Sequence, residues 1–436
     1  MKGLLRLAVF LFVGSPFAMA QDQPEWVFGR ILVDQYEAVG PGRNQRESET
    51  LQSGLTFFGG IDPALSETVT SKLLVRGSAF RRSLENPNSF IFRGDVREAW
   101  VDHSEKGFSV RAGEVVTAWG RSDAVNPTDY LTAKDFTFLS SSDDVRRKGA
   151  PGVRMSLTPN GGVSPWEITV AWNALYPQSK LLIPTSAIPA GLQVETDPEN
   201  PRLLGNRQEW AFKLAYLAPS FDLSLSAFDG RTHFGQFIWD GTSVRLAYLP
   251  VRALGTDFSV TFDQFVLRGE SAYFFYDVGR AGGGSLSLTE PNHWDTVVGI
   301  ERPLGERFRL IAQLLYRVHP SLRDSQAYTS ASPLDTAVVR GVGKANALIQ
   351  NYQDHSRVGA TFLFSYTSSD EIWTGELAAI GNFVGGDYLL RPKLGRKFGE
   401  RMRLAAGVDY YGGPTDRPLG SLRDYRSANL EGSLTF

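Results

Sequence analysis

The chain closes on Ser427–Phe436, SANLEGSLTF, in which apolar and polar side chains alternate up to the last residue. In an extended strand, Leu430, Leu434 and Phe436 share one face and Glu431 lies on the other. A soluble domain more often ends in polar residues that fray. This stretch therefore predicts a final β-strand, and the fold depends on what the apolar face of that strand contacts.

The same period of two recurs along the chain. Clear examples are WAFKLAYL (210–217), FDLSLSAF (221–228), FRLIAQLLYR (308–317), RVGATFLFSY (357–366) and MRLAAGVDYY (402–411). In each stretch one face is apolar, with aromatic residues near its ends, and the other face is charged or small. The apolar face would form the core of a soluble sandwich, or it would contact lipid in a membrane barrel with an aqueous lumen. The alternation alone leaves both folds open.

The lengths of the connectors separate these two folds. We expect about 18 strands, an even number that is typical of bacterial single-chain barrels. Their approximate first residues are Trp26, Thr50, Val69, Phe90, Phe108, Val153, Trp166, Arg207, Phe221, Ser243, Phe265, Asp295, Phe308, Arg357, Trp373, Asp387, Arg401 and Ala428. Connectors after even-numbered strands are short, whereas most of the others are long. This sorting predicts an all-β, antiparallel up-and-down transmembrane barrel with short periplasmic turns and long extracellular loops.

The strand register is least certain at three places. We interpret the long stretch Ser243–Phe262 as one strand whose outer part extends beyond the membrane. Strict alternation would turn Glu98 and Glu114 toward lipid, which is costly near the bilayer midplane. We therefore expect a β-bulge at each glutamate, or a position near a membrane interface.

The N-terminal residues 1–20 predict a cleaved signal peptide. Lys2 and Arg6 precede an apolar run that ends in Ala18-Met19-Ala20, and this run is too short to span a membrane comfortably. We expect residues 21–436 to form a single barrel domain exported to the outer membrane of a Gram-negative bacterium. No cysteine is present, so neither a lipoprotein anchor nor disulfides are expected. The first strand follows the cleavage site too closely for a plug domain.

Composition argues against other classes of protein. The net charge of -2 lacks the basic excess of proteins that bind nucleic acids. After Gln21 no apolar segment has the length of a transmembrane helix. A wide barrel is also too large for side chains alone to fill, which favours a pore over a purely structural role.

The final stretch LEGSLTF resembles the last strand of Gram-negative outer-membrane barrels. In that class a terminal phenylalanine on an alternating strand is the signal read by the barrel-assembly machinery. The resemblance implies that this machinery recognises the strand ending at Phe436. It also implies outer-membrane lipid and lipopolysaccharide as surroundings of the barrel.

A second resemblance to known outer-membrane barrels covers about a fifth of the chain. REAWVDHSEKGFSVRAGEVVTAWG (97–120) is similar to a hairpin of porin-like and alginate-export-like outer-membrane proteins. The matching residues are Arg97, Glu98, Ala99, Trp100, Arg111, Gly113, Trp119 and Gly120. The stretch Arg268-Gly269-Glu270 is similar in character. This resemblance supports the barrel fold and carries no ligand to this chain.

Alternation turns a set of charged side chains toward the lumen, where such groups tune selectivity. The pore-lining candidates are Lys72, Arg76, Arg154, Arg207, Lys213, Arg268, Glu270, Arg309, Arg317, Arg357, Arg391, Lys393 and Arg403. Basic residues outnumber acidic residues modestly in the inward-facing set, which favours anions. Alternatively, these charges pair with charges on neighbouring strands and stiffen the wall, and Arg268 and Glu270 are typical members of such a ladder.

The long connector Gly120–Gly149 is the candidate constriction. Its three aromatic residues argue against plain disorder, and we expect it to fold into the mouth of the barrel. The side chains expected near the pore are Lys134, Asp143, Asp144, Arg146 and Arg147. The other interpretation is an outer lid with no role in permeation.

These patterns predict a channel for passive diffusion of small hydrophilic, anionic solutes. The alternative is a dedicated conduit for a polymer such as an acidic polysaccharide. No cofactor or metal is implied. None of the five histidines lies in a recognisable catalytic motif, so we do not expect an enzyme.

Overall fold

A computed structural model gives the fold of the chain. It describes residues 26–39, 50–82, 86–122, 125–139, 143–180, 194–196, 208–276 and 288–436. The expected signal peptide (1–20) and Arg207 lie outside the described residues.

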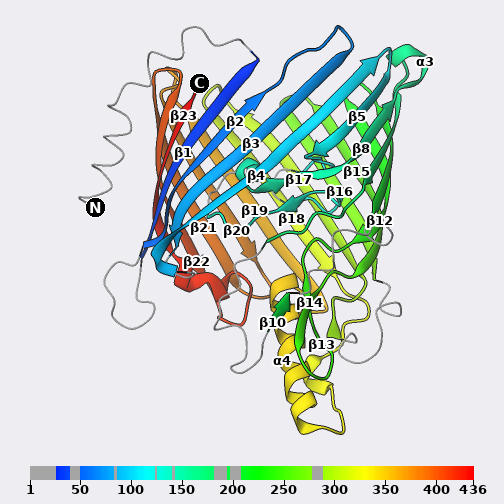
Figure 1. The fold of residues 1–436 in the computed structure, drawn as a ribbon, viewed down its shortest axis with the longest axis vertical. Helices are drawn as coiled ribbons and strands as arrows, with labels where there is room; N and C mark the ends of the chain where they lie inside the picture. Colours follow the sequence, from blue (N-terminus) through cyan, green and yellow to red (C-terminus); the bar gives the residue numbers. More distant parts are fainter. Residues whose placement is uncertain are drawn as a thin grey trace.

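Eighteen antiparallel strands form one closed barrel (Figure 1). The wall strands are β1 (Val27–Ala38), β2 (Thr50–Ile61), β3 (Val69–Arg82), β4 (Asn86–Glu105), β5 (Phe108–Val115), β8 (Ala150–Leu157), β9 (Trp166–Asn173), β11 (Glu209–Leu217), β12 (Phe221–Arg231), β15 (Pro250–Phe262), β16 (Phe265–Tyr276), β17 (His293–Leu304), β18 (Phe308–Val318), β19 (Ser356–Thr367), β20 (Trp373–Asn382), β21 (Asp387–Phe398), β22 (Met402–Gly412) and β23 (Ser427–Thr435). Each strand pairs with its neighbours in the chain, and β1 pairs with β23. The predicted 18-stranded up-and-down barrel is confirmed.

The two ends of the barrel wall meet at the terminal phenylalanine. The Phe436 N–H donates to the Gly29 carbonyl at 3.0 Å, and the Gly29 N–H donates back to the Phe436 carbonyl at 2.8 Å. The Phe436 ring lies against Phe57, with 6.5 Å between centroids, on the outer wall. The apolar face of the last strand therefore points outward, as expected.

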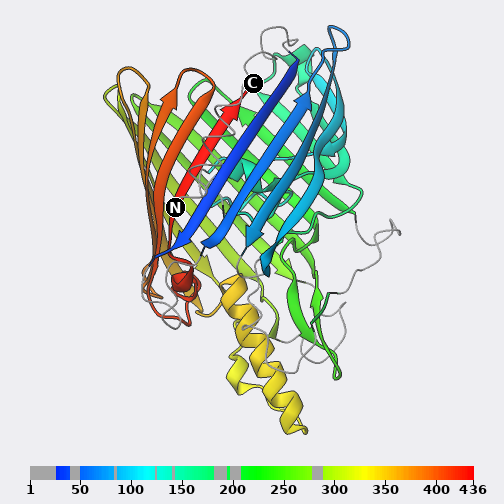
Figure 2. The ribbon, with the colours of Figure 1, turned by 60° about the vertical axis from the view of Figure 1, so that its left-hand side comes forward.

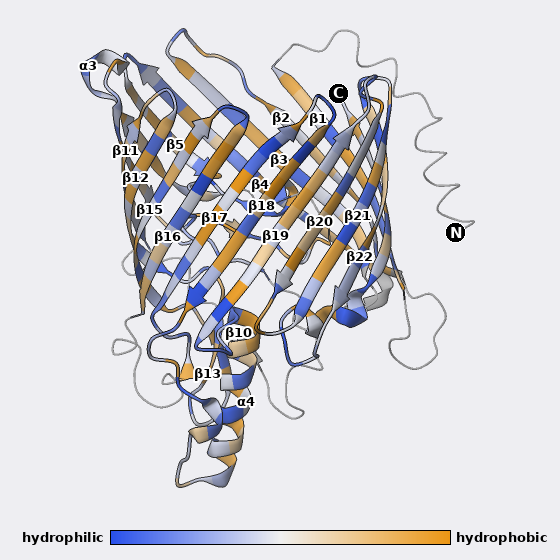
Figure 3. Ribbon diagram, turned by 180° about the vertical axis from the view of Figure 1, so that it is seen from behind, coloured by the Kyte–Doolittle hydropathy of each residue, from blue (hydrophilic) through white to orange (hydrophobic). Residues whose placement is uncertain are grey.

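The outer wall is apolar along the whole barrel. Figure 3 shows the alternation as bands of hydrophobic and hydrophilic residues along the strands. Among the most exposed large side chains are Phe92, Trp210, Leu225, Leu254, Leu314 and Leu394. This surface suits lipid and would be unfavourable in water.

Turns at one end of the barrel are short, and most loops at the other end are long. The two-residue turn Lys106-Gly107 has positive φ at both positions, 38° and 85°, as a tight hairpin requires. The remaining short elements are β6 (Ala133–Lys134), β7 (Arg147–Lys148), β10 (Val194–Thr196), β13 (Gln236–Trp239), β14 (Val244–Ala247), α2 (Asp143–Arg146), α3 (Pro159–Gly162), η4 (Ser325–Ala327) and η5 (Gly420–Tyr425). We refer to the two rims as the short-turn end and the long-loop end.

A β-bulge in β4 resolves the conflict at Glu98. Leu74 pairs with Glu98 and Val75 pairs with Val96, so Arg97 is an extra residue in its strand. This insertion shifts the alternation, and Glu98 turns inward to bind Lys72 at 2.6 Å. The expected bulge at Glu98 is confirmed.

No register shift occurs at Glu114, which pairs with Ala99 and Pro151. It is the penultimate residue of β5, next to the point where the chain leaves the wall. Of the two expectations for this glutamate, the bulge is therefore wrong.

The stretch Ser243–Phe262 is not one continuous strand. β14 ends at Ala247, and the barrel strand β15 begins at Pro250. β14 belongs instead to a small sheet with β10 and β13 at the long-loop end. Outside the membrane no lipid constrains the chain to extend the wall, so it can leave the barrel. The number of wall strands is unchanged by this correction.

One long helix interrupts the connector between β18 and β19. α4 (Pro333–Gln350) projects beyond the rim, as Figure 2 shows. The Ser332 hydroxyl accepts the Asp335 N–H at 3.2 Å, and Asn351 ends the helix in the left-handed conformation. Val338 and Val342 pack against Phe237 and Val244 of the small sheet. No helix in the described ranges is both long and apolar enough to cross a membrane.

The bulge yields a test of which β4 side chains contact lipid. Val96 points outward and is 49% exposed. We expect Val96→Arg to destabilise the barrel in lipid vesicles by about 2–4 kcal/mol if the site is near the midplane. Val96→Ala serves as the control for the lost side chain. Urea unfolding followed by heat-modifiable gel mobility measures the difference, and equal stability of the two variants would contradict the outward assignment.

Candidate functional site: the lumen and its inward-folded loop

The described residues of the connector between β5 and β8 (116–122, 125–139 and 143–149) lie inside the barrel. Both of these strands have 8 residues, whereas the neighbouring β4 has 20, so the chain leaves the wall early. Residues 116–149, here called the inner loop, carry α2 and the short pair β6–β7. Figures 1 and 2 show this segment between the walls of the barrel.

A buried glutamate of β16 holds the beginning of the inner loop. Glu270 is 2% exposed, and its carboxylate accepts the backbone N–H groups of Arg121 and Ser122, each at 2.5 Å. It also accepts the N–H and the hydroxyl of Thr128, at 3.1 and 2.8 Å. A Cβ on Gly120 would lie 2.8 Å from this carboxylate, so a glycine permits the close approach.

Ion pairs strengthen the same attachment. The Arg121 guanidinium bridges two wall strands, with Nε 2.6 Å from Asp257 Oδ1 and Nη1 2.7 Å from Asp222 Oδ2. Lys213 donates to the carbonyl oxygen of Trp119 at 2.6 Å. Asp257 is fully buried, so its charge needs such partners.

Aromatic packing completes this contact. The Tyr130 ring stacks on Phe228 with 5.4 Å between centroids and meets Phe274 edge-on. A Cβ on Gly255 of β15 would lie 2.0 Å from the Tyr130 hydroxyl oxygen. The wall therefore has a glycine where the loop side chain needs space.

The second half of the inner loop contacts the opposite part of the wall. Phe138 packs edge-on against Phe80 of β3 at 5.6 Å. The Val145 carbonyl accepts from Arg76 at 3.0 Å and from Arg97, the bulge residue, at 2.8 Å. Because β3 and β16 are far apart around the barrel, the loop crosses the lumen between them.

The predicted constriction residues lie on this crossing segment. Asp143 binds both Lys134 and Arg147 at 2.8 Å. Burial would raise the pKa of Asp143, but these two cations outweigh it and lower the pKa. Burial and, after it, the charge of Arg391 lower the pKa of Arg146, whose guanidinium carbon lies 5.7 Å from the centroid of the Phe136 ring. The side chain of Asp144 lies outside the described part of the chain.

Most of the pore-lining candidates pair with carboxylates on other wall strands. The pairs are Lys72–Glu98 (2.6 Å), Arg76–Asp95, Arg268–Glu301 (2.8 Å), Arg309–Glu301 (2.6 Å), Arg317–Asp295 (2.5 Å), Arg391–Asp409 (2.6 Å) and Lys393–Glu431. Arg268 of β16 pairs with Glu301 of β17, as expected for charges that pair across neighbouring strands. Glu270 of the same strand instead accepts backbone amides of the inner loop.

The remaining candidates have looser contacts with carboxylates. Arg357 and Arg403 each lie 3.9 Å from a carboxylate, Asp387 and Glu376 respectively. Arg154 donates to Thr117 Oγ1 at 2.5 Å, to the Trp172 carbonyl oxygen at 3.1 Å and to Asn173 Oδ1 at 2.7 Å, so its guanidinium is occupied. Of these three cations, Arg403 has the most exposed side chain, at 41%, and retains the most capacity to interact with a passing solute.

Hollows lie on both sides of the inner loop. One, of about 260 Å³, is bounded by Phe138 and Val145 of the loop and by strands β1, β2, β21, β22 and β23. Its charged lining comprises Arg30, Asp34, Lys393, Arg403 and Glu431. The other, of about 350 Å³, lies between loop residues 125–132 and the outer ends of β12, β16 and β17. We call the second one the vestibule.

Sequence patterns missed several of these contacts. Arg30 lines the hollow beside the loop and Arg97 donates to the Val145 carbonyl, but neither was among the candidates. Arg97 is the extra residue of the bulge, where alternation assigns no direction. Arg121 lies in the connector, where alternation assigns no direction. Its neighbours Trp119 and Gly120 did stand out in the hairpin motif.

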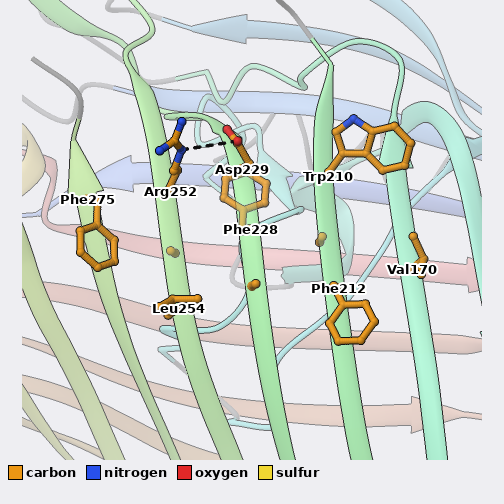
Figure 4. A pocket seen from close by; sticks show the side chains of 11 residues that line it. Val170, Trp210, Phe212, Phe228, Asp229, Arg252, Leu254 and Phe275 are labelled. Carbon is orange, nitrogen blue, oxygen red and sulfur yellow. Dashed lines mark ion pairs between the residues drawn. The ribbon is translucent and has the colours of Figure 1, made fainter. Parts of the chain in front are cut away.

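A further hollow of about 530 Å³ lies on the outer wall and not in the lumen (Figure 4). Trp210, Phe212 and Leu254 flank it, and the exposed pair Arg252–Asp229, at 3.5 Å, marks its long-loop side. Its apolar lining fits lipid chains, and it takes no part in the passage through the barrel.

The barrel is similar to solved structures. The fold is that of outer-membrane porins. The chain is similar to the outer-membrane protein OpdK of Pseudomonas aeruginosa, with a TM-score of 0.53 and 10% identity over 94% of this chain and 98% of that one. It is also similar to OccAB1 of Acinetobacter baumannii, with a TM-score of 0.52 and 9% identity over 97% and 99%. The sequence matches no protein-family model and no curated protein. Similarity to alginate-export barrels stays a prediction.

The buried carboxylate of Glu270 can be tested by proteolysis. We expect Glu270→Gln to loosen the inner loop, because an amide replaces a charged acceptor of four hydrogen bonds, at a cost of about 1–3 kcal/mol. Trypsin should then cleave at Lys134 or Arg147 faster than in the wild-type barrel. Glu376→Gln, a half-exposed wall glutamate that does not contact the loop, is the matched control. Equal cleavage rates in all three proteins would argue against the anchoring role.

Proposed function

We propose that the chain is an outer-membrane channel for passive diffusion of small hydrophilic anions. The observation that carries this proposal is the inner loop, which crosses the lumen from β16 to β3 and leaves hollows of molecular size beside it. A barrel with 18 strands is otherwise too wide to discriminate among small solutes. A narrowed passage brings a solute close to the charged wall.

The charges at the level where the inner loop crosses the lumen, here called the narrow level, support a preference for anions. The hollow beside Phe138 is lined by three cations and two carboxylates. Arg146 adds a positive charge on the loop side, near Arg391. An anion between these groups would relieve their mutual repulsion. A solved structure of OpdK contains vanillate, a carboxylate, and so a carboxylate-bearing solute is the ligand class we propose.

The crossing loop favours diffusion of small solutes over export of a polymer. A chain of linked sugars needs a continuous open bore, and the inner loop is held to both walls by buried contacts. We propose no catalytic activity. Ser104 donates to Asp102 at 2.7 Å, while the adjacent His103 is exposed, so this pair does not form a nucleophile and base.

The proposed setting is the outer membrane of a Gram-negative bacterium, reached after export through the signal peptide. The short-turn end then faces the periplasm, and α4 stands on the extracellular side. Outer-membrane lipid and lipopolysaccharide surround the apolar wall. The strand ending at Phe436 is the element that we propose the barrel-assembly machinery recognises.

Reversal potentials across a planar bilayer under a salt gradient test the anion preference. We expect steady conductance with an anion-leaning reversal potential. Arg146→Gln and Arg403→Gln should each lower the anion-to-cation permeability ratio about two- to fivefold, since one charge about 8 Å from an ion is worth ~0.5 kcal/mol in water. Arg252→Gln removes the same charge from the outer wall and should leave the ratio unchanged. A cation-leaning wild type would overturn the proposal, and a silent barrel would favour a gated conduit.

A further inference from the structure

A compact group of buried side chains lies at the rim of the vestibule, apart from the narrow level. Glu290 precedes β17, His293 is the first residue of β17, and His319 follows β18. All three side chains are buried, and His319 is fully enclosed. One potential ligand atom from each residue lies within 4.8 Å of the other two.

The hydrogen bonds of His319 leave a lone pair directed into this group. Its Nδ1 lies 3.3 Å from the carbonyl oxygen of Asp354, a contact that requires Nδ1 to carry the proton. Its Nε2 is then an acceptor, and this atom is buried without a hydrogen-bond partner. A buried nitrogen in this state calls for a ligand or ion.

The other two residues offer matching donors of electron pairs. Nδ1 of His293 lies 3.2 Å from the Pro291 carbonyl oxygen and therefore carries the proton, which makes Nε2 the nitrogen that can bind a metal. This Nε2 lies 3.8 Å from Asp295 Oδ2, and the His293 ring centroid is 5.2 Å from that of His319. Glu290 Oε2 accepts the Tyr276 hydroxyl at 2.8 Å, which orients the carboxylate. Such bonds to backbone carbonyls and carboxylates are typical of the shell that fixes metal ligands.

The surrounding charge suits a cation. Arg317 donates from Nε and Nη2 to the two carboxylate oxygens of Asp295, each at 2.5 Å, and its Nη1 lies 3.5 Å from Glu290 Oε1. Two carboxylates therefore face one guanidinium, which leaves one negative charge when both imidazoles are neutral. Among the other vestibule residues, Asp129 and Arg231 carry opposite charges.

We propose that Glu290, His293 and His319 bind a divalent transition-metal ion of the zinc class at the rim of the vestibule. Two imidazoles and one carboxylate suit zinc, nickel or copper better than magnesium or calcium, which prefer oxygen ligands. Tetrahedral zinc with bonds of about 2.1 Å needs ligand atoms about 3.4 Å apart. The ligand atoms of the three residues lie within 4.8 Å of one another, so the side chains would draw together when the ion binds. The fourth position faces the vestibule, which Glu290 and His293 line.

The test uses the full barrel, refolded without a histidine tag and stripped with a chelator. Cobalt(II) is the optical probe, and zinc is the competitor. We expect one cobalt to bind per barrel, with visible absorption bands that zinc abolishes. His319→Ala and Glu290→Gln should each weaken cobalt binding at least about 100-fold. His103→Ala removes an exposed histidine from the short-turn end of β4 and should change nothing.

Heat-modifiable gel mobility shows which variants have folded. If His319→Ala does not fold, cobalt binding to Glu290→Gln and His293→Asn is compared with binding to the wild type instead. Absence of cobalt binding to the folded wild type overturns the site and makes the group a purely structural cluster. Binding that survives in the folded site variants, or that is lost with His103→Ala, overturns it as well. Because the channel proposal is measured by reversal potential, either proposal can fail without the other.

Discussion

The burial of one carboxylate, that of Glu270, determines how the interior of this barrel is arranged. A buried charge without partners is strongly unfavourable, and this one is satisfied by groups of the inner loop. The loop in turn depends on the wall, since Arg121 finds its counter-charges on Asp222 and Asp257. Removing either side would leave unpaired charges on the other. Loop and wall therefore specify each other, and the loop becomes part of the barrel's core.

The wall could be predicted from the sequence because lipid imposes a local rule. Every second residue of a strand faces an apolar solvent, so the pattern is visible residue by residue. The same rule located the bulge, since Glu98 was the residue that broke it. This alternation rule does not apply outside the membrane, and for that reason the sequence pattern did not predict α4 or the small sheet that contains β14. The capping Ser332 and the apolar spacing of Val338 and Val342 were signals of that helix.

The candidate site was harder to predict, since its contacts join distant parts of the chain. Arg121 and Glu270 are 149 residues apart, and alternation states only that Glu270 faces inward. The two stretches singled out by resemblance, Trp119-Gly120 and Arg268-Gly269-Glu270, are nevertheless the two sides of this single contact. A motif can therefore preserve both halves of an interaction while the sequence gives no sign that they meet.

The crossing of the lumen has a consequence for transport. A finger that projects from one wall can swing aside, whereas a bridge held at both walls keeps its position. The contacts of Glu270 and Arg121 on one side and of Val145 on the other make the inner loop such a bridge. In the proposed channel, the width available to a solute would therefore be set by the fold and not by movement of the loop.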